Sequence, residues 1–426
     1  MRILFLNQFF WPDTAATGQL LSDLAEHLAN SGETVEVICG SANYGGSNSA
    51  PCPAVGVTRL PTARFSTGVG GRLAAYFSFI VGSLWHGIRQ PAPDIVVTLT
   101  TPPLISLVGM AIQQLRGSKH IIWEMDVYPD IAVDLGMLQR NGLPARVFGW
   151  LADLPRRRAN RVIALGECMR LRLLSHGLAE ENVHVAEHWA DCDALSARER
   201  IRIVPPRRSE ELSIIYSGNF GRAHDAETIA GAMTKLNCVD DGFRFVFGGG
   251  GSRQAWLRDF CEQNALANTQ FLPYCERSEL HARLALGHIG LVTQHADSAG
   301  AVVPSKAYGI MAAGRPVLYI GPRNSTTALM IRRYDCGWQI DCGDVPGLVA
   351  TLRHLRAHGH LVSAAGERAY QAFADHYQRS LGVARMASAM ELGIARVPVL
   401  TAQTANGEKE AMKGESGTSP RVAQNG

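Results

Sequence analysis

Short apolar segments alternate with longer helical segments through most of the chain, and this alternation limits the fold more than any other feature. In the first half, strands are predicted at 2–7, 35–39, 94–99, 120–124, 161–165 and 183–186, with helices at 18–30, 104–115 and 167–175. Two parallel strands need a crossover, which is usually a helix. The pattern therefore predicts a parallel sheet with helices on both faces.

The alternation breaks once and then starts again. The segment 196–211, SARERIRIVPPRRSEE, is charged, contains prolines and lacks helical periodicity, so it is interpreted as a linker. Further strands are predicted at 212–217, 243–247, 269–272, 289–293 and 317–320, with helices such as 226–236 and 254–264 between them. The sequence predicts an α/β fold of two doubly wound, Rossmann-like domains, 1–195 and 212–375, that face a ligand-binding cleft. A helix over 376–396 is expected to return to the first domain, and 397–426 is polar enough to be disordered.

Charge and cysteine content exclude some classes of function. The net charge is only +3, and no dense basic stripe is interleaved with aromatic residues, so we expect no nucleic-acid partner. Nine cysteines without a CxxC pair predict free thiols in a reducing compartment. Since no leader sequence is expected either, the protein is predicted to be cytoplasmic.

One apolar segment, LAAYFSFIVGSLWHGI at 73–88, has two interpretations. As a helix it would be roughly 24 Å long, which is shorter than a membrane span of about 20 residues. It is either a buried core helix or a helix that lies in the interfacial layer of a membrane, with Arg72 and Arg89 on the headgroups. The arginines of PRRRANR (155–161) and RLR (170–172) form either a solvated face or a cationic surface for anionic lipid.

The segment VVPSKAYGIMAAGRPVLYIG, 302–321, combines a loop, a short helix and a buried strand. Pro304 suits the first turn of a helix, KAYGIMAA is helical in composition, and Gly314 is placed to end the helix. The free amides of a helix N-terminus carry partial positive charge, and Lys306 adds a full one. The segment is therefore a predicted anion site.

Three segments that contain glycine are further candidates. YSGNFGRAHD ends a strand in Gly218 and Gly221, and Arg222 is placed to bind phosphate there, although an ordinary strand–helix turn fits the spacing equally well. FVFGGGGS includes Gly249 but fails the GxGxxG pattern, so it predicts a close approach of backbone rather than a dinucleotide site. Gly18 opens a helix and lets either a ligand or another chain segment pass close by.

Together these segments resemble the retaining glycosyltransferases of family 4, which have the GT-B fold. The resemblance extends over about 1–390, and the opening NQFFWPDTAATGQLL is most similar to the bacterial enzymes of exopolysaccharide and O-antigen assembly. AEHWAD resembles the family's crossing into the second domain, and WEMDVYPD resembles its Asp-Leu-Trp-Pro-Glu segment.

The resemblance implies a binding site for a nucleotide-sugar donor. It places the distal phosphate and the sugar of the donor at Val303, Pro304 and Ser305, with Lys306 beside them. Further donor contacts are predicted from Gly18, Gly218, Asn219, Gly221, His224, Gly249 and Tyr274.

This chain departs from the family's pattern at several charged positions. The diphosphate-binding Arg and Lys of the family align on Asn219 and His224, so Arg222 is expected to replace them. The two glutamates that the family commonly has around the helix fall on Ala301 and Gly309.

The resemblance also implies a reaction. It predicts transfer of a hexosyl- or N-acetylhexosaminyl-type sugar, with retention, to a lipid-linked or saccharide acceptor in lipopolysaccharide or exopolysaccharide synthesis. The family's acceptor-side His-Asp becomes Met125-Asp126, so Asp126 joins Arg222 and Lys306 as a predicted catalytic residue. We expect no metal and no cofactor, because the nucleotide-sugar is a substrate. A peripheral contact with the inner membrane face would bring a lipid-linked acceptor within reach.

Two other functions are open on the sequence alone. A nucleotide-sugar 2-epimerase can have the same fold, but it needs acid and base side chains at the sugar, and no obvious set is present. The missing glutamates also fit a non-catalytic partner subunit that keeps the fold and has lost the chemistry.

Overall fold

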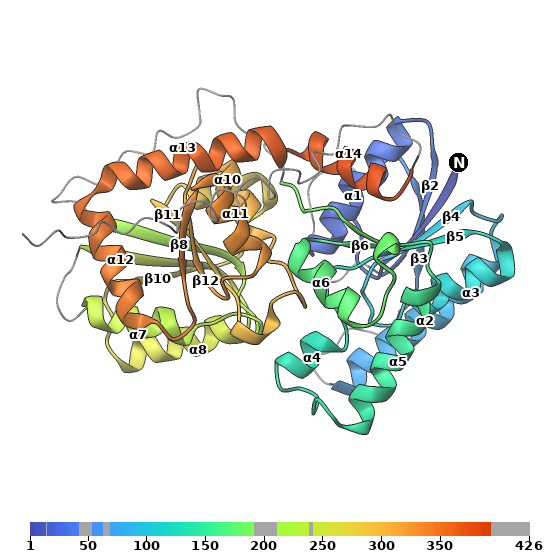
Figure 1. Ribbon diagram of the computed structural model, residues 1–426, viewed down its shortest axis with the longest axis horizontal. Coiled ribbons are helices and arrows are strands. Elements are labelled where there is room, and N and C mark those ends of the chain that lie inside the picture. Colours follow the sequence, from blue (N-terminus) through green and yellow to red (C-terminus); the bar gives the residue numbers. More distant parts are fainter. Residues whose placement is uncertain (14, 42–52, 63–68, 191–210, 238–241, 393–426) are drawn as a thin grey trace, which may run out of the picture.

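The computed structural model describes residues 1–13, 15–41, 53–62, 69–190, 211–237 and 242–392, which form two lobes side by side (Figure 1). The predicted linker, apart from Glu211, and the predicted disordered tail lie outside the described residues. The same holds for 393–396, at the end of the predicted C-terminal helix.

The first lobe is built around a parallel sheet. In spatial order its strands are β3 (Gly56–Leu60), β2 (Thr34–Gly40), β1 (Arg2–Leu6), β4 (Ile95–Thr98), β5 (Lys119–Trp123), β6 (Arg161–Ala164) and β7 (Val183–Val185). The helices are α1 (Ala16–Asn30), α2 (Val69–Arg89), α3 (Ser106–Arg116), α4 (Asp130–Asp134), α5 (Leu143–Arg158) and α6 (Glu167–Ser175). Helices cover both faces of the sheet, which is why every residue of β4 is apolar or Thr and is buried.

The second lobe repeats this plan. Its parallel strands, in spatial order, are β10 (Thr269–Leu272), β9 (Phe243–Gly250), β8 (Leu212–Asn219), β11 (Ile289–Thr293), β12 (Val317–Ile320) and β13 (Gly337–Ile340). Its helices are α7 (Glu227–Asn237), α8 (Ser252–Gln263), α9 (Leu280–Leu284), α10 (Lys306–Ala312), α11 (Thr326–Tyr334), α12 (Val345–Ala357) and α13 (Gly359–His376). In both sheets the carboxyl ends of the strands meet at one edge, where ligands bind in folds of this kind.

The strands follow the predicted alternation, with a few differences. β10, β11 and β12 have the predicted bounds, whereas β9 continues to Gly250 because its glycines keep pairing with β8. The prediction did not include β3, β13 or α5. In β3 only Leu60 is buried, so the strand lacks the continuous apolar run of a central strand. In α5, Pro155 lies inside the helix and disguises it in the sequence.

The short helix α10 corrects one local prediction. It begins at Lys306, with Ser305 as the N-cap residue, so Pro304 precedes the helix and does not occupy its first turn. Gly314 follows the helix with φ of +65°, as expected of a glycine that ends a helix.

The apolar segment 73–88 lies in α2 and is buried on one side only. Ala75 and Phe79 are fully buried against the sheet, whereas the side chain of Phe77 is 70% exposed. A helix buried on all sides is therefore contradicted. In the described part of the chain, no helix combines the length and the apolar character needed to cross a bilayer.

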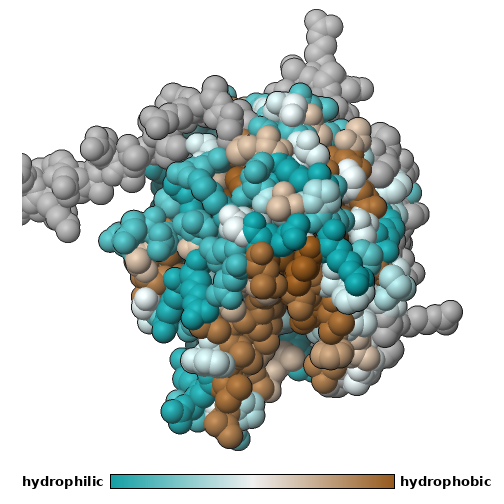
Figure 2. Space-filling model, turned by 90° about the vertical axis from the view of Figure 1, so that its right-hand side faces the viewer, coloured by the Kyte–Doolittle hydropathy of each residue, from teal (hydrophilic) through white to brown (hydrophobic). Residues whose placement is uncertain are grey.

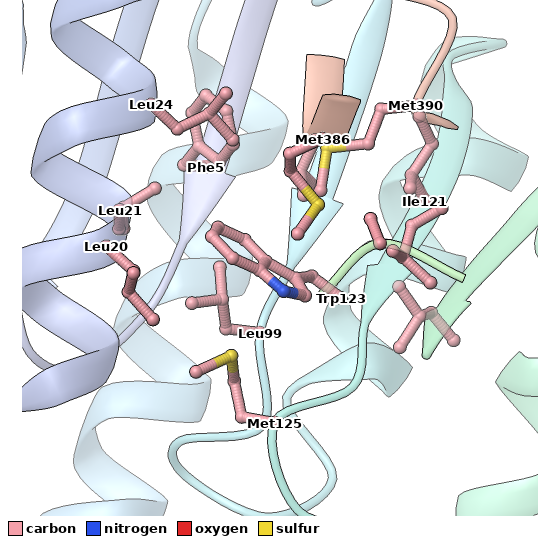
Figure 3. Packing of buried hydrophobic residues seen from close by; sticks show 14 of the residues in the cluster. Phe5, Leu20, Leu21, Leu24, Leu99, Ile121, Trp123, Met125, Met386 and Met390 are labelled. Atoms are coloured by element: carbon pink, nitrogen blue, oxygen red, sulfur yellow. The ribbon is translucent and has the colours of Figure 1, made fainter. Parts of the chain in front are cut away.

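The C-terminal segment completes the core of the first lobe. From α13 the chain crosses to the first lobe, where α14 (Arg379–Ala389) packs against α1 (Figure 1). Met386 and Met390 enter the same buried cluster as Phe5 and Trp123 (Figure 3).

A buried carboxylate on α1 ties three parts of the chain together. Asp23 is 4% exposed and accepts a hydrogen bond of 3.0 Å from the indole Nε1 of Trp189. It also forms ion pairs with Arg277 of the second lobe, at 3.1 Å, and with Arg379 of α14, at 3.4 Å. Asp23 therefore holds the second lobe and α14 against the first lobe.

Replacing Gly382 of α14 with valine should lower the free energy of unfolding. Gly382 approaches Trp189 so closely that an added Cβ would lie 2.4 Å from the Trp189 Cβ. Overpacking of this kind costs roughly 2 kcal/mol, which chemical denaturation can measure. Ser380→Ala, at an exposed position of the same helix, is the matched control and should shift stability by less than about 0.5 kcal/mol. Equal stability of the two variants would contradict the packing described here.

Candidate functional site

The carboxyl ends of β8 and β9 carry a pair of glycines that bring two backbones unusually close. In the register of the two strands, Gly218 lies opposite Gly249. Both have positive φ, +130° and +119°, which favours glycine. A Cβ on Gly249 would lie 2.2 Å from the carbonyl oxygen of Gly218, so no larger residue fits. The predicted close approach of backbone at the glycine run is therefore found between these two strands.

Lys306 packs its side chain against this glycine pair. A Cβ placed on Gly218 would lie 2.7 Å from the Lys306 Cε, and the ammonium lies 5.4 Å from the centre of the Tyr216 ring. Burial lowers the pKa of Lys306 to about 8, and within the described residues no carboxylate counteracts this shift. A half-buried cation that lacks a counter-ion favours an anionic ligand.

His224 lies close to Lys306 and Tyr216, and it is uncharged at neutral pH. Burial and the Lys306 ammonium lower the pKa of His224 to about 3. Its Nδ1 donates a hydrogen bond of 2.7 Å to the carbonyl oxygen of Thr293, and its Nε2 lies 3.4 Å from the hydroxyl of Tyr216. The Tyr216 hydroxyl donates to the carbonyl oxygen of Asn219 at 2.6 Å. His224 thus braces the turn after β8 and does not supply positive charge there.

The other predicted donor contacts of the second lobe surround this turn. Arg222 is exposed, and Asn219 and Gly221 lie close together beside it. Tyr274 is 56% exposed, and its ring lies 2.9 Å from where a Cβ on Gly250 would be. The structure therefore brings together Gly218, Asn219, Gly221, Arg222, His224, Gly249, Tyr274 and Lys306.

The loop that leads into α10 is held from both lobes. Gln294 is buried, donates from Nε2 to the carbonyl oxygens of Ser298 and Val302 at 3.0 and 3.2 Å, and accepts from the Tyr319 hydroxyl at 2.7 Å. Sequence reasoning missed Gln294, and a glutamine directly after a buried strand is the signal that could have revealed it. Val303 belongs to the core of the first lobe, so only its backbone is available to a ligand, whereas Pro304 and Ser305 are half-exposed.

Asp126 reaches this loop from the first lobe. It forms a β-bridge with Val302, and the amide of the next residue, Val127, donates to the carbonyl oxygen of Ala301 at 2.8 Å. Burial, and then the nearby Glu124 carboxylate, raise the pKa of Asp126 to about 6. The acidic group of the first lobe and the cation of the second lobe therefore stand at opposite ends of one short segment.

Among the predicted donor contacts, Gly18 has a structural role, because close packing at this position favours a glycine. A Cβ on Gly18 would lie 3.3 Å from the backbone of Phe9 and of Phe10, so the neighbour at the start of α1 is another segment of the same chain.

The arginines of 155–161 and 170–172 do not form one cationic surface. Arg156 is buried and bonds to Glu124 at 2.6 Å and to Asp153 at 3.0 Å. Arg172 contacts Asp130 and Asp134, and Arg170 contacts Glu167 and Glu180. The cationic interpretation is therefore wrong for Arg156, Arg170 and Arg172, because most of their partner carboxylates come from other elements, whose positions the sequence does not reveal. Arg157 and Arg158 are exposed.

Comparison with protein families and curated proteins gives a consistent result. Residues 16–189 match the model of the glycosyl transferase 4-like domain. The chain is 25% identical over 346 residues to the Escherichia coli (strain K12) protein named "Putative colanic acid biosynthesis glycosyl transferase WcaI", covering 74% of this chain and 82% of the relative. It is 23% identical over 287 residues to "Probable glycosyltransferase WbjE" of Pseudomonas aeruginosa, covering 66% and 71%.

Solved structures share the fold. Sucrose-phosphate synthase from Thermosynechococcus elongatus superposes with a TM-score of 0.73 at 12% identity, over 92% of this chain and 99% of that one. Anabaena HepE in complex with UDP and glucose gives 0.67 at 12% identity, with the same coverage. These likenesses confirm the predicted fold class, two doubly wound domains in the GT-B arrangement.

Replacing Gly249 with alanine should destabilise the protein more than the same change at Gly32. Both glycines have positive φ, but nothing lies within 4 Å of a Cβ on Gly32. Alanine at Gly32 should cost about 1 kcal/mol for the backbone conformation alone. Alanine at Gly249 should cost roughly 2 kcal/mol beyond that, because it meets the Gly218 carbonyl. Urea denaturation of the two variants checks this, and equal losses would rule out the tight contact.

Proposed function

We propose that this chain, whose residues 16–189 match the model of the glycosyl transferase 4-like domain, transfers a sugar with retention from a nucleotide-sugar to an acceptor. The family match and both curated relatives support a glycosyltransferase, and the name of the Escherichia coli relative, a colanic acid biosynthesis enzyme, supports a role in polysaccharide synthesis. The finer parts of the proposal are a hexosyl- or N-acetylhexosaminyl-type sugar, a lipid-linked or saccharide acceptor, and a contact with the inner membrane face.

The position and burial of the Lys306 ammonium are the main support for the proposal. It is half-buried and has a pKa near 8, and it lies against the backbone of Gly218, where only glycine leaves room for it. A nucleoside diphosphate would supply the missing negative charge. Anabaena HepE, which shares the fold, was solved in complex with UDP, and this supports the class of ligand. Arg222 is exposed in the turn that follows β8, and we expect it to contribute a second cation.

The proposed reaction breaks the bond between the anomeric carbon and the departing phosphate oxygen. The acceptor oxygen bonds to the same face of that carbon, and its proton passes to the departing phosphate oxygen. Lys306 and Arg222 stabilise the negative charge that grows on the leaving diphosphate, so the proposal needs no metal ion for this step. Asp126 accepts a hydrogen bond from a neighbouring hydroxyl of the acceptor and so orients it, which leaves the proton of the attacking hydroxyl for the phosphate oxygen.

Replacing Lys306 with methionine should lower kcat by roughly 10²–10³, the usual loss for one preorganised donor aimed at developing charge. The donor is first found by a thermal-shift screen of UDP-, GDP-, ADP- and dTDP-sugars, and turnover is then followed as release of the nucleoside diphosphate. Lys235→Met, at an exposed position of α7, is the matched control and should leave kcat unchanged. Full activity of the Lys306 variant would remove the proposed phosphate contact.

Two further measurements distinguish the other functions that fit the fold. A new nucleotide-sugar formed without any acceptor would identify an epimerase. Failure of every nucleotide-sugar and nucleoside diphosphate to bind, measured by calorimetry, would identify a non-catalytic subunit.

The pH profile of kcat/KM should rise through about pH 6, because the pKa of Asp126 is near 6 and its ionised form is the one that accepts a hydrogen bond. Below that pH the protonated carboxyl cannot act in this way, so the rate falls. Asp126→Asn should be slower and should lose this limb of the profile. Asp259→Asn, an exposed position of α8, is the control and should keep it. An Asp126→Asn profile that still bends near pH 6 would assign the limb to another group.

A further inference from the structure

We propose that the outer face of the first lobe, formed by α2 and α5, docks on a bilayer that contains anionic lipid. This inference extends the proposed function. It depends on that proposal only for the idea that the acceptor is linked to a lipid. Figure 2 turns this side of the molecule toward the viewer and shows hydrophobic side chains gathered in one band, bordered by hydrophilic ones.

Every fourth residue of the exposed side of α2 is large and apolar. Leu73, Phe77, Val81 and Trp85 are 61, 70, 49 and 56% exposed. Because residues four apart on a helix are neighbours, these side chains form one continuous stripe along the axis. An exposed stripe of this length marks an interaction surface, since monomeric proteins rarely leave such patches in water.

A second apolar stripe runs along α5. Leu143, Val147 and Trp150 are 72, 47 and 64% exposed and follow one another at helical spacing. The helix α3 packs against both α2 and α5, and its Leu115 is 64% exposed as well. The three helices therefore share one outer layer of the lobe.

The charges around this face are almost all positive. The segments 69–89, 106–116 and 135–158 contain one acidic residue, Asp153, which bonds to Arg156 and His176. Exposed arginines that make no ion pair within the described residues are Arg89, Arg116, Arg146, Arg157 and Arg158. The Arg89 guanidinium lies 3.1 Å from the centre of the Trp85 ring, so cation and apolar stripe are in direct contact.

This combination favours a bilayer over a second copy of the chain. A two-fold dimer through this face would place the same arginines opposite one another without acidic partners. Anionic headgroups supply the missing negative charge, and the acyl region accepts the leucines and aromatic rings. The one-sided stripe suits a helix that lies in the plane of the interface.

The face is connected to the acceptor side of the site through Tyr128. Its ring stacks on Phe148 of α5, with ring centres 6.2 Å apart. Burial, the Asp126 carboxyl and Tyr76 of α2 together raise the pKa of Tyr128, which places all three groups near one another. Docking would therefore bring the bilayer alongside Asp126, so that a saccharide on a membrane lipid reaches the site while its lipid stays in the membrane.

The test is sedimentation of the full chain with vesicles of phosphatidylcholine, with and without phosphatidylglycerol. We expect binding to the vesicles that contain phosphatidylglycerol, weakening as salt is added. Phe77→Glu and Trp150→Glu should each lower the partition coefficient by about tenfold or more, since each removes an aromatic anchor and adds repulsion. Leu286→Glu, at a 52% exposed leucine of the second lobe, is the matched control and should bind as the unchanged protein does. Far-ultraviolet circular dichroism confirms that each variant is folded.

Three outcomes would overturn the proposal. The unchanged protein could stay in solution with both kinds of vesicle, or the Phe77 and Trp150 variants could bind as well as the control. A dimer in solution that Phe77→Glu dissociates, with no vesicle binding, would show that a second copy covers this face. Calorimetry with nucleoside diphosphates keeps the two proposals apart: vesicle binding without nucleotide binding would leave the docking surface standing and refute the transferase.

Discussion

The junction between the lobes depends on how the segment between β11 and α10 is held. Gln294 holds it from inside the second lobe, and the amide of Val127 holds it from the first lobe through Ala301. Both contacts act on a few adjacent residues, so the backbone enters α10 with Lys306 in a defined position relative to Asp126. The geometry of the two ionisable groups is thus set by backbone and amide hydrogen bonds and not by an attraction between the groups themselves.

The charges at this junction are arranged so that one side chain carries most of the positive potential. His224 stays neutral because burial and the neighbouring ammonium both disfavour its protonated form. The pKa of Asp126 is near 6 and that of Lys306 is near 8, so between these values the first lobe presents a carboxylate and the second an ammonium. An anion bound beside Lys306 would raise the lysine pKa again and widen that range.

The sequence was sufficient for the parts of the fold that depend on local pattern. Continuous apolar strands, helices between them, Lys306 at the start of α10 and the glycines after β8 and β9 all follow from residue type and spacing. The sequence was insufficient where the partner is remote in the chain. Arg156 reads as one of a row of solvated arginines, yet it is buried against Glu124, just after β5. Gln294 likewise acquires its role only from Tyr319 and from the path of the following loop.

The edge elements were missed for a related reason. β3 and α5 face solvent on one side, so the apolar pattern that identifies central elements is weakened in them. In α5 the pattern is inverted over part of the helix, because Leu143 and Trp150 point outward. An inverted pattern of this kind becomes interpretable only when the fold shows which side of the helix is the inside.

The return of α14 to the first lobe has a consequence for biosynthesis. Met386 and Met390 complete the cluster that contains Phe5 and Trp123, so the core of the first lobe includes side chains from both ends of the described chain (Figure 3). A ribosome releases the N-terminal sheet long before it releases α14. The nascent first lobe must therefore persist with an incomplete core, and its apolar interior partly uncovered, until the second lobe has been made.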